Sequence, residues 1–365
     1  MSPNPPGPPP DLALVVAVHN DGAGLARLLQ QTGRLGIAAQ VVVVDDGSDP
    51  PCALYPGMAF ARRVLPGVRI DWLRTQGPEG RACGAGAARN LGLAEVRTPL
   101  VLFFDADDMV TGAIRGLLAD LTRDWHAHGP FDMALFAHHD SRMLAQGRAG
   151  PQEPPDRALW AQHAPGPALR ALDRAGALAM CRVSNYPWNR IWRTGFLRDA
   201  GVRFTESMLH NDIAPHWAGF LSGQRLLCSG RACAIHTVVP GRAQLSARRG
   251  RDRLAAFDAL DAVLDRLLEE VARDAGRAAF AGPLLDFTCR LTGWIATRLD
   301  DPGDIAALQA RARGFMVRMA QAENGDLARA VDTALGPGVE PGLAARLLSV
   351  LGAPSGAFGR TAAGA

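Results

Sequence analysis

The chain has 365 residues, 48% of them hydrophobic, which is enough for one large domain or two domains with a real core. Its formal net charge is only +3 and no basic tract occurs, which argues against a nucleic-acid partner. Because no run of about 18 apolar residues occurs and the six cysteines form no CxxC pair, we expect no membrane span, no zinc knuckle and a reducing, cytoplasmic location.

The first elements in chain order predict a doubly wound sheet. Residues 1–10 hold six prolines and no apolar core, which favours a disordered Pro-rich arm over a signal peptide. A buried strand over Asp11–Val18, a helix over Leu25–Leu35 and a second buried strand over Gln40–Val44 follow. Strand, helix and strand in this order are the opening of an α/β fold with a parallel sheet.

Carboxylates directly follow the second strand and a later one. Asp45 and Asp46 end the second strand, and a third strand is expected over Val68–Leu73. The apolar run Leu100–Phe104 is typical of a strand buried on both faces. It is followed by three carboxylates: Asp105, Asp107 and Asp108. Carboxylates gathered at strand ends favour a site for Mg²⁺ or Mn²⁺.

An ordinary turn is the alternative for the second acidic group, because Thr111 is placed to cap a helix over Gly112–Leu121. Two acidic strand ends in one sheet favour a nucleotide site instead, with a Gly-rich segment over residues 79–86 running into a helix at Ala85–Val96. The segment is neither a Walker loop nor a GxGxxG fingerprint.

Four motifs in register resemble one known family: Val15–Asn20, Val44–Ser48, Gly86–Gly92 and Phe104–Asp108. Together they resemble glycosyltransferase family 2, whose members are inverting enzymes of the GT-A fold that use a nucleotide-diphosphate sugar as donor. The resemblance covers about residues 11–245, with a nucleotide-binding half at about 11–122 and an acceptor half at about 123–245.

The resemblance implies roles for the residues of the first half. Asp46 contacts the nucleotide base, and the backbone around Ala17 lines its pocket. Asp105 and Asp107 correspond to the family's DxD pair, with Asp107 the metal ligand and Asp105 facing the ribose or a metal-bound water. Arg89 lies near the diphosphate, and the alternative for it is an ion pair on the helix face.

The acceptor half is less regular. We expect a strand over Asp132–Ala137 and a flexible loop over Met143–Ala168 that shapes the acceptor site. His138 and His139 are adjacent on a strand and point to opposite faces, so they do not share one metal ion. Trp188 is a candidate for stacking on an acceptor sugar; it lies four residues from Trp192, and the same spacing on a helix also suits a core residue.

The catalytic residue implied by the resemblance is Asp212, the general base that deprotonates the acceptor hydroxyl. Asn211 stands where the family has Glu, which leaves Asp212 without a charged neighbour. The alternative is that Asp212 only caps a helix over Ile213–Leu221. The resemblance also implies roles for two residues further along the chain. His236, on a strand at Cys233–Val239, is a third metal ligand, and Arg242 binds the diphosphate.

Residues 246–352 predict a helical region, and residues 353–365 a flexible tail. Its first helix combines an apolar stripe through Phe257 and Leu264 with an acidic face through Asp258 and Asp265, which argues against docking on an anionic membrane. We expect the stripe to pack on the catalytic domain or on another subunit.

The sequence thus predicts inverting, metal-dependent sugar transfer from a nucleotide-diphosphate sugar to a saccharide or other hydroxyl acceptor, in polysaccharide or glycoconjugate assembly. Two alternatives remain. One is a catalytically silent GT-A-like scaffold. The other, a sugar nucleotidyltransferase, is disfavoured because the first strand ends in His19–Gly22 without a Gly-rich basic signature.

Overall fold

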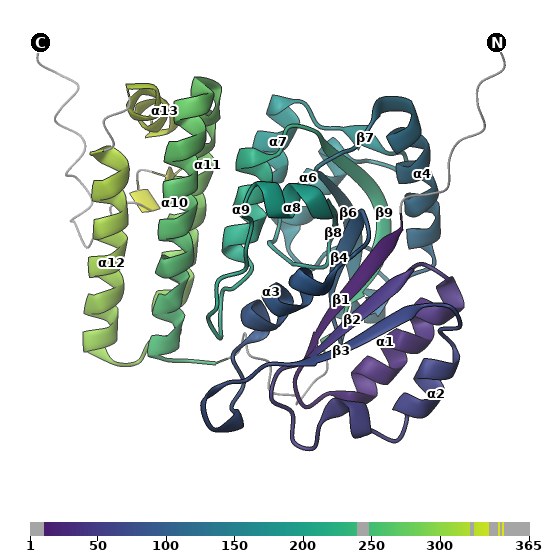
Figure 1. Cartoon of the computed structure of the whole chain (residues 1–365). Coiled ribbons are helices and arrows are strands. Elements are labelled where there is room, and N and C mark those ends of the chain that lie inside the picture. The colour runs from purple at the N-terminus through teal and green to yellow at the C-terminus, as the bar shows by residue number, and fades with distance from the viewer. Residues whose placement is uncertain (1–10, 239–247, 322–324, 336–341, 344, 347–365) are drawn as a thin grey trace, which may run out of the picture. The chain divides into compact units, whose positions relative to one another are not determined.

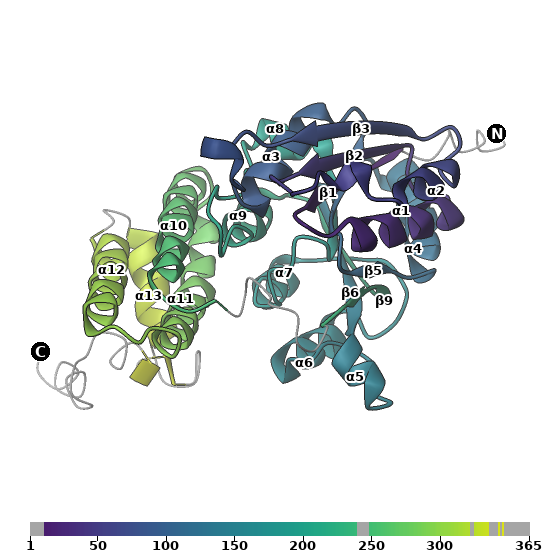
Figure 2. The same ribbon diagram turned by 90° about the horizontal axis from the view of Figure 1, so that it is seen from below.

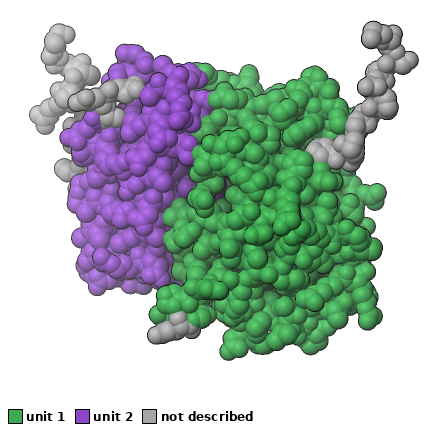
Figure 3. Space-filling model, viewed as in Figure 1, with its two compact units in different colours: residues 1–208, 222–242 green, residues 209–221, 243–365 purple. Residues whose placement is uncertain are grey.

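The structure is a computed structural model that describes residues 11–238, 248–321, 325–335, 342–343 and 345–346. The chain divides into two compact units, coloured separately in Figure 3: unit 1 is Met1–Met208 with Ser222–Arg242, and unit 2 is Leu209–Leu221 with Ala243–Ala365. The segment with Asp212, which the sequence placed in the acceptor half, therefore groups with the helical unit. No described helix is long and apolar enough to cross a membrane.

Unit 1 is built on one mixed sheet, shown in Figure 1. Its strands within the described residues run in the order β3-β2-β1-β4-β8-β6-β9-β5, and β7 pairs with β9. Their bounds are β1 Leu12–Val18, β2 Gln40–Asp45, β3 Arg69–Arg74, β4 Leu100–Asp105, β5 Met109–Val110, β6 Met133–Asp140, β7 Arg170–Ala171, β8 Arg190–Arg193 and β9 Leu226–His236. Strands β1 to β4 are parallel, as predicted, and β8 joins β4 antiparallel.

Helices lie on both faces of the first four strands, as Figures 1 and 2 show. The helices of unit 1 are α1 Gly22–Leu35, α2 Met58–Arg63, α3 Ala85–Glu95, α4 Ala113–His128, α5 Ser141–Ala145, α6 Pro154–His163, α7 Arg174–Met180 and α8 Thr194–Asp199. Alternate residues of β1 face opposite layers. Val16 belongs to the core cluster with α1 and α4 residues, whereas Val15 lies under Gly92 of α3, where a Cβ would approach Val15 Cγ1 to 2.5 Å. Burial on both faces explains the continuous apolar runs.

Two local predictions in unit 1 are wrong. The stretch predicted as a flexible loop, Met143–Ala168, contains the helix α6. Trp188 and Trp192 do not share a helix, because Trp192 lies on β8 and Trp188 precedes that strand. The turn that the sequence offered as an alternative at the acidic group is present, since the N–H of Asp108 donates to the carbonyl oxygen of Asp105 at 3.2 Å, and Thr111 Oγ1 accepts from the N–H of Ala113 at the start of α4. The short strand β5, which pairs with β9, was not predicted.

Unit 2 is helical in its described residues. It contains α9 Ile213–Ser222, whose last residue is counted with unit 1, and then α10 Ala256–Arg273, α11 Ala281–Ala296, α12 Pro302–Ala320 and α13 Gly325–Leu335. The predicted apolar stripe of α10 is buried, with Phe257 and Leu264 at most 1% exposed. Its acidic face binds α12: Arg318 contacts Asp261 at 2.6 Å and Asp265 at 2.5 Å. The acidic side chains therefore hold two helices of the unit together.

Candidate functional site

The carboxyl ends of β1, β2 and β4 bring the predicted donor residues to one edge of the sheet. In the register of the parallel strands, Ala17 lies between Val44 of β2 and Asp105 of β4. Ala17 and Asp105 are half-buried, whereas the residues before them on these strands are buried. Both share the face that carries α3, because Val15, two residues before Ala17, packs under Gly92. The two residues therefore form an accessible floor at the end of a buried sheet.

The turns after β1 and β2 are tied together. His19 donates from Nδ1 to the carbonyl oxygen of Asp46 at 2.6 Å, and its Nε2 accepts from Asn20 Nδ2 at 3.0 Å. Asn20 has a positive φ of 51°, and its N–H donates to Ser48 Oγ at 2.9 Å. The carboxylate of Asp45, 4% exposed, accepts from the N–H groups of Ser48 and Cys52. Asp45 therefore shapes its own turn, a role that the sequence did not indicate.

Asp46 anchors the Gly-rich segment over the end of β2. Its carboxylate accepts from Thr75 Oγ1 at 2.6 Å and from the N–H groups of Cys83 and Gly84, each at 2.8 Å. Gly84 has a φ of +96°, which an L side chain rarely adopts, and α3 begins at the next residue. Asp46 thus fixes where α3 starts. Its contact with a nucleotide base stays a prediction.

Arg89 extends from α3 to the end of β4. Its Nη2 lies 2.5 Å from Asp105 Oδ1, its guanidinium lies over the ring of Phe204, and the residue is only 4% exposed. The alternative of an ion pair along the helix face does not describe this contact, because the partner lies on a strand. The buried arginine and the half-exposed carboxylate therefore form a charge-assisted pair that fixes both groups at the sheet edge.

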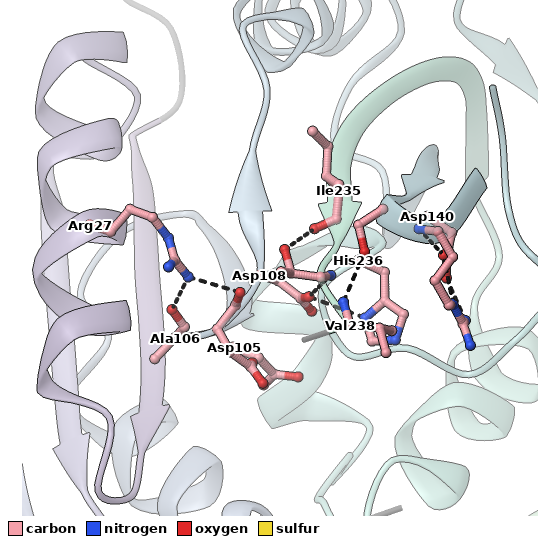
Figure 4. A network of polar contacts seen from close by, with 12 residues as sticks. Arg27, Asp105, Ala106, Asp108, Asp140, Ile235, His236 and Val238 are labelled. Carbon is pink, nitrogen blue, oxygen red and sulfur yellow. Dashed lines mark hydrogen bonds and ion pairs between the residues drawn. The ribbon is translucent and has the colours of Figure 1, made fainter. Parts of the chain in front are cut away.

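The turn from Asp105 to Asp108 is held from α1 (Figure 4). Arg27 Nη2 donates to the carbonyl oxygens of Asp107 at 2.9 Å and Ala106 at 3.3 Å. Gly24 lies against the same turn, since a Cβ there would approach the Ala106 carbonyl to 2.7 Å. Asp107 is half-buried and Asp108 is 2% exposed. The turn therefore presents Asp107 toward solvent and Asp108 toward the protein.

The buried Asp108 and the half-buried His236 form a pair, also drawn in Figure 4. Asp108 Oδ1 lies 3.1 Å from His236 Nδ1 and accepts from the N–H of Thr237 at 2.7 Å. Burial raises the pKa of Asp108, against the hydrogen bond from His236. Burial alone lowers the pKa of His236, but the hydrogen bond and charge of Asp108 outweigh it and leave this pKa raised. Both shifts favour a proton on the pair.

Trp188 belongs to the core behind this pair. It is 1% exposed and packs in an aromatic cluster with Tyr186, His138 and His236; its ring centroid lies 4.5 Å from that of Tyr186 in a stacked arrangement. This burial favours the core alternative over a sugar-stacking surface. His138 points into the cluster, whereas His139 faces the other way and accepts from the N–H of Gly150, as the alternation along β6 predicts.

The residues present fit a divalent metal that arrives with a diphosphate. Among the described residues, no group of three or more His, Cys, Asp or Glu side chains is arranged to hold a metal ion. Mg²⁺ is usually held by one or two carboxylates together with substrate phosphates, so the half-exposed Asp107 suits it. Because Nδ1 of His236 is hydrogen-bonded to Asp108, Nε2 is the ring nitrogen that can bind a metal. Histidines that bind metals usually have their other ring nitrogen hydrogen-bonded to a carboxylate in this way.

Asp212 lies at the start of α9 in unit 2. It is half-buried, and its backbone carbonyl accepts from the N–H of His216 at 3.2 Å, which opens the helix. Its neighbour Asn211 is 8% exposed. This position suits the capping alternative, and the role of general base stays a prediction. Arg242, predicted for the diphosphate, lies outside the described residues.

Asn90, next to Arg89, has a role that the sequence did not reveal. Its side chain pairs with the backbone of Phe204, accepting from its N–H at 2.9 Å and donating to its carbonyl at 2.9 Å. It also donates to Glu206 at 3.2 Å. The sequence singled out Asn90 only as a member of the Gly86–Gly92 motif, which does not indicate a partner 114 positions away.

The fold is similar to that of solved S. aureus TarS structures. S. aureus TarS residues 1–349 in complex with UDP-GlcNAc match with a TM-score of 0.68 at 16% identity, over 93% of this chain and 89% of that one. A further S. aureus TarS structure matches with a TM-score of 0.61 at 18% identity, over 93% of this chain and 54% of that one. The predicted α/β fold of GT-A type is thereby confirmed.

One relative is similar in sequence. The succinoglycan biosynthesis protein ExoU of Rhizobium meliloti (strain 1021) is 26% identical over 260 residues, which are 70% of this chain and 70% of ExoU. No family model matches the chain.

Proposed function

We propose that this protein is an inverting, metal-dependent glycosyltransferase that moves a sugar from a nucleotide-diphosphate sugar to an acceptor hydroxyl. One observation carries the proposal: Ala17, Asp46, Arg89 and Asp105, which the family resemblance assigns to the donor, lie together at the carboxyl edge of the sheet. Ligands of open α/β sheets bind at this edge. The TarS structure of the same fold is a complex with UDP-GlcNAc, which supports a nucleotide sugar as donor.

Different residues of the donor half bind different parts of the nucleotide-sugar donor. The floor at Ala17 and Asp105 takes the nucleoside, and Arg89 contributes positive charge toward the diphosphate. Asp107 is the proposed ligand of Mg²⁺ or Mn²⁺, with His236 as a second. A bound divalent ion supplies Lewis-acid stabilisation of the departing diphosphate. Since His236 keeps a raised pKa beside Asp108, metal binding there displaces a proton and weakens as pH falls.

Asp212 is the proposed general base for the attack of the acceptor. Its carboxylate takes the proton of the acceptor hydroxyl as the oxygen attacks the anomeric carbon from the side opposite the diphosphate. The bond from that carbon to the diphosphate oxygen breaks, and its electron pair leaves with the diphosphate. A single displacement inverts the anomeric configuration. Asn211 adds no charge beside the base, so the family's paired-carboxylate effect is absent.

The acceptor class follows from the relative in sequence. Because ExoU is a succinoglycan biosynthesis protein, we place this protein in polysaccharide or glycoconjugate assembly in the cytoplasm, with a saccharide or another hydroxyl compound as acceptor. Loops of the acceptor half set that specificity, and α6 within 143–168 is the element to vary first.

The test is a thermal-shift panel of nucleoside diphosphates and nucleotide sugars, with and without Mn²⁺. A ligand present at a hundred times its dissociation constant stabilises the folded state by about 2.7 kcal/mol. We expect one base to raise the melting temperature only with Mn²⁺, and Asp107→Ala to abolish this effect. Asp199→Ala, which removes an exposed carboxylate at the end of α8, is the matched control. No response to any nucleotide would favour the silent scaffold and refute the proposal.

A further inference from the structure

An exposed apolar surface lies between β2 and β3. Of the seven large hydrophobic residues that are exposed in the described chain, three come from this one stretch: Leu54 at 72%, Tyr55 at 40% and Phe60 at 53%. Together with Arg62 and Arg63, both exposed, we call them the α2 surface. Scattered exposed hydrophobics are ordinary, but a cluster of large ones marks an interaction site.

The residues of the α2 surface are fixed in place by packing against the core and α1. Met58 and Ala61 of α2 are 1% and 0% exposed and belong to the core cluster. Tyr55 packs on the first turn of α1, since a Cβ on Gly22 would approach Tyr55 Cβ to 2.6 Å. Phe60 lies on the side of α2 opposite these buried residues, because positions 58 and 61 share one helix face. The fold therefore fixes Phe60 and Leu54 outward.

The charge of the α2 surface is positive. The chain from Pro50 to Ile70 has three arginines and no acidic residue. Arg69 pairs with Asp71, and Arg62 lies over the ring of Trp72 at 4.6 Å. Within the part of the chain that the structure describes, neither Arg62 nor Arg63 has an ion pair with a carboxylate. Arg62 and Arg63, two cations without a carboxylate partner, thus lie on the same short helix as the exposed Phe60.

We propose that the α2 surface attaches the protein reversibly to an anionic lipid bilayer. Apolar side chains that enter the headgroup region beside arginines that meet lipid phosphates are the features of interfacial membrane segments. A second copy of the chain fits worse, because a two-fold contact of this surface with itself would oppose Arg62 and Arg63 to their own copies. The area that three apolar side chains can bury is also far smaller than the roughly 800 Å² per partner that a stable protein interface buries.

The experiment is co-sedimentation of the full chain with vesicles. Vesicles of phosphatidylcholine alone are compared with vesicles that also contain phosphatidylglycerol. We expect binding to the anionic vesicles only, weakening as salt is added, since a Debye length of about 10 Å at 0.1 M screens the arginines. Equal binding to both vesicles, or binding to neither, overturns the proposal.

Two variants locate the contact. Leu54→Ser with Phe60→Ser should weaken vesicle binding by about tenfold or more, through lost apolar insertion. Arg63→Gln should weaken it by about fivefold, the share of one arginine at an anionic surface. The matched controls are Val317→Ser, an apolar residue on α12 that is 49% exposed, and Arg34→Gln, an exposed arginine at the end of α1; both should bind as wild type does.

The melting temperature and the nucleotide response of each variant show whether it is still folded and binds nucleotide. All five substituted positions are exposed, so the melting temperatures of the variants should equal that of wild type, and the nucleotide responses of the panel above should not change. If Leu54→Ser with Phe60→Ser leaves vesicle binding unchanged, the proposal is wrong. It is also wrong if wild type forms a concentration-dependent dimer by light scattering that this double variant abolishes, because the surface is then a contact between copies.

Discussion

Replacing Asn90 by alanine should destabilise the protein without removing any group that meets a ligand. Asn90 is 7% exposed, and its amide satisfies both the N–H and the carbonyl of Phe204. Alanine supplies neither partner, so two backbone groups near Phe204, a residue that is 5% exposed, lose their hydrogen bonds.

The magnitude follows from burial. A buried donor or acceptor left without a partner costs about 1–3 kcal/mol, and the gain of about 0.5 kcal/mol in helix propensity from asparagine to alanine offsets part of it. For two such groups we expect the free energy of unfolding to fall by about 1.5–5.5 kcal/mol. The contact with Glu206 adds little, because surface pairs contribute about 0–1 kcal/mol.

The assay is equilibrium unfolding in urea followed by tryptophan fluorescence. Five of the seven tryptophans lie in unit 1, so the signal reports mainly on the unit that contains Asn90. Leu91→Ala is the control, since Leu91 is the next residue on α3 and is 38% exposed. An Asn90→Ala variant that unfolds within about 0.5 kcal/mol of Leu91→Ala would refute the reasoning.

Three further predictions concern single residues. Arg27→Ala removes two hydrogen bonds that hold the Asp107 turn and should weaken Mn²⁺-dependent nucleotide binding by about fivefold in calorimetry, whereas Arg34→Ala should leave it unchanged. Burial raises the pKa of Cys233 to about 12, so iodoacetamide at about pH 8 should label it only in urea; labelling of the native protein would contradict this. Burial lowers the pKa of His138 to about 3 from 6.5, so the unfolded chain is protonated first and stability falls as pH drops below about 6.5. His138→Phe should flatten that loss by up to about 1.4 kcal/mol per pH unit in urea titrations, and the exposed control His126→Gln should not.

The sheet edge was predictable because its signals are local. Strands β1, β2 and β4 are continuous apolar runs, each ended by a polar turn, and a strand buried on both faces needs such a run. Parallel strands with intervening helices must bring their carboxyl ends to one edge, so Asp46 and Asp105 had to lie at the same edge, on either side of β1.

The details of the site depended on contacts between distant residues. The contact of Asp46 with a nucleotide base stays a prediction, but its hydrogen bonds from the amides of Cys83 and Gly84 were not predicted, because they form only when the Gly-rich segment folds back over β2. Trp188 looked like a sugar platform, but β6 and β9 bury it beside His138 and His236. No pattern of neighbouring residues contains such pairings, which arise only when the sheet is assembled.

The most direct test of the proposed function is release of nucleoside diphosphate from nucleotide sugars, in Mn²⁺, by wild type, Asp212→Asn and the control Asp199→Asn. Positioned general bases contribute about 10²–10⁴-fold to rate. We expect wild type and Asp199→Asn to turn over one donor with water or a simple sugar as acceptor, and Asp212→Asn to lose about 10²-fold or more in rate while its Mn²⁺-dependent donor binding stays intact. An Asp212→Asn enzyme as fast as wild type would contradict the proposed mechanism.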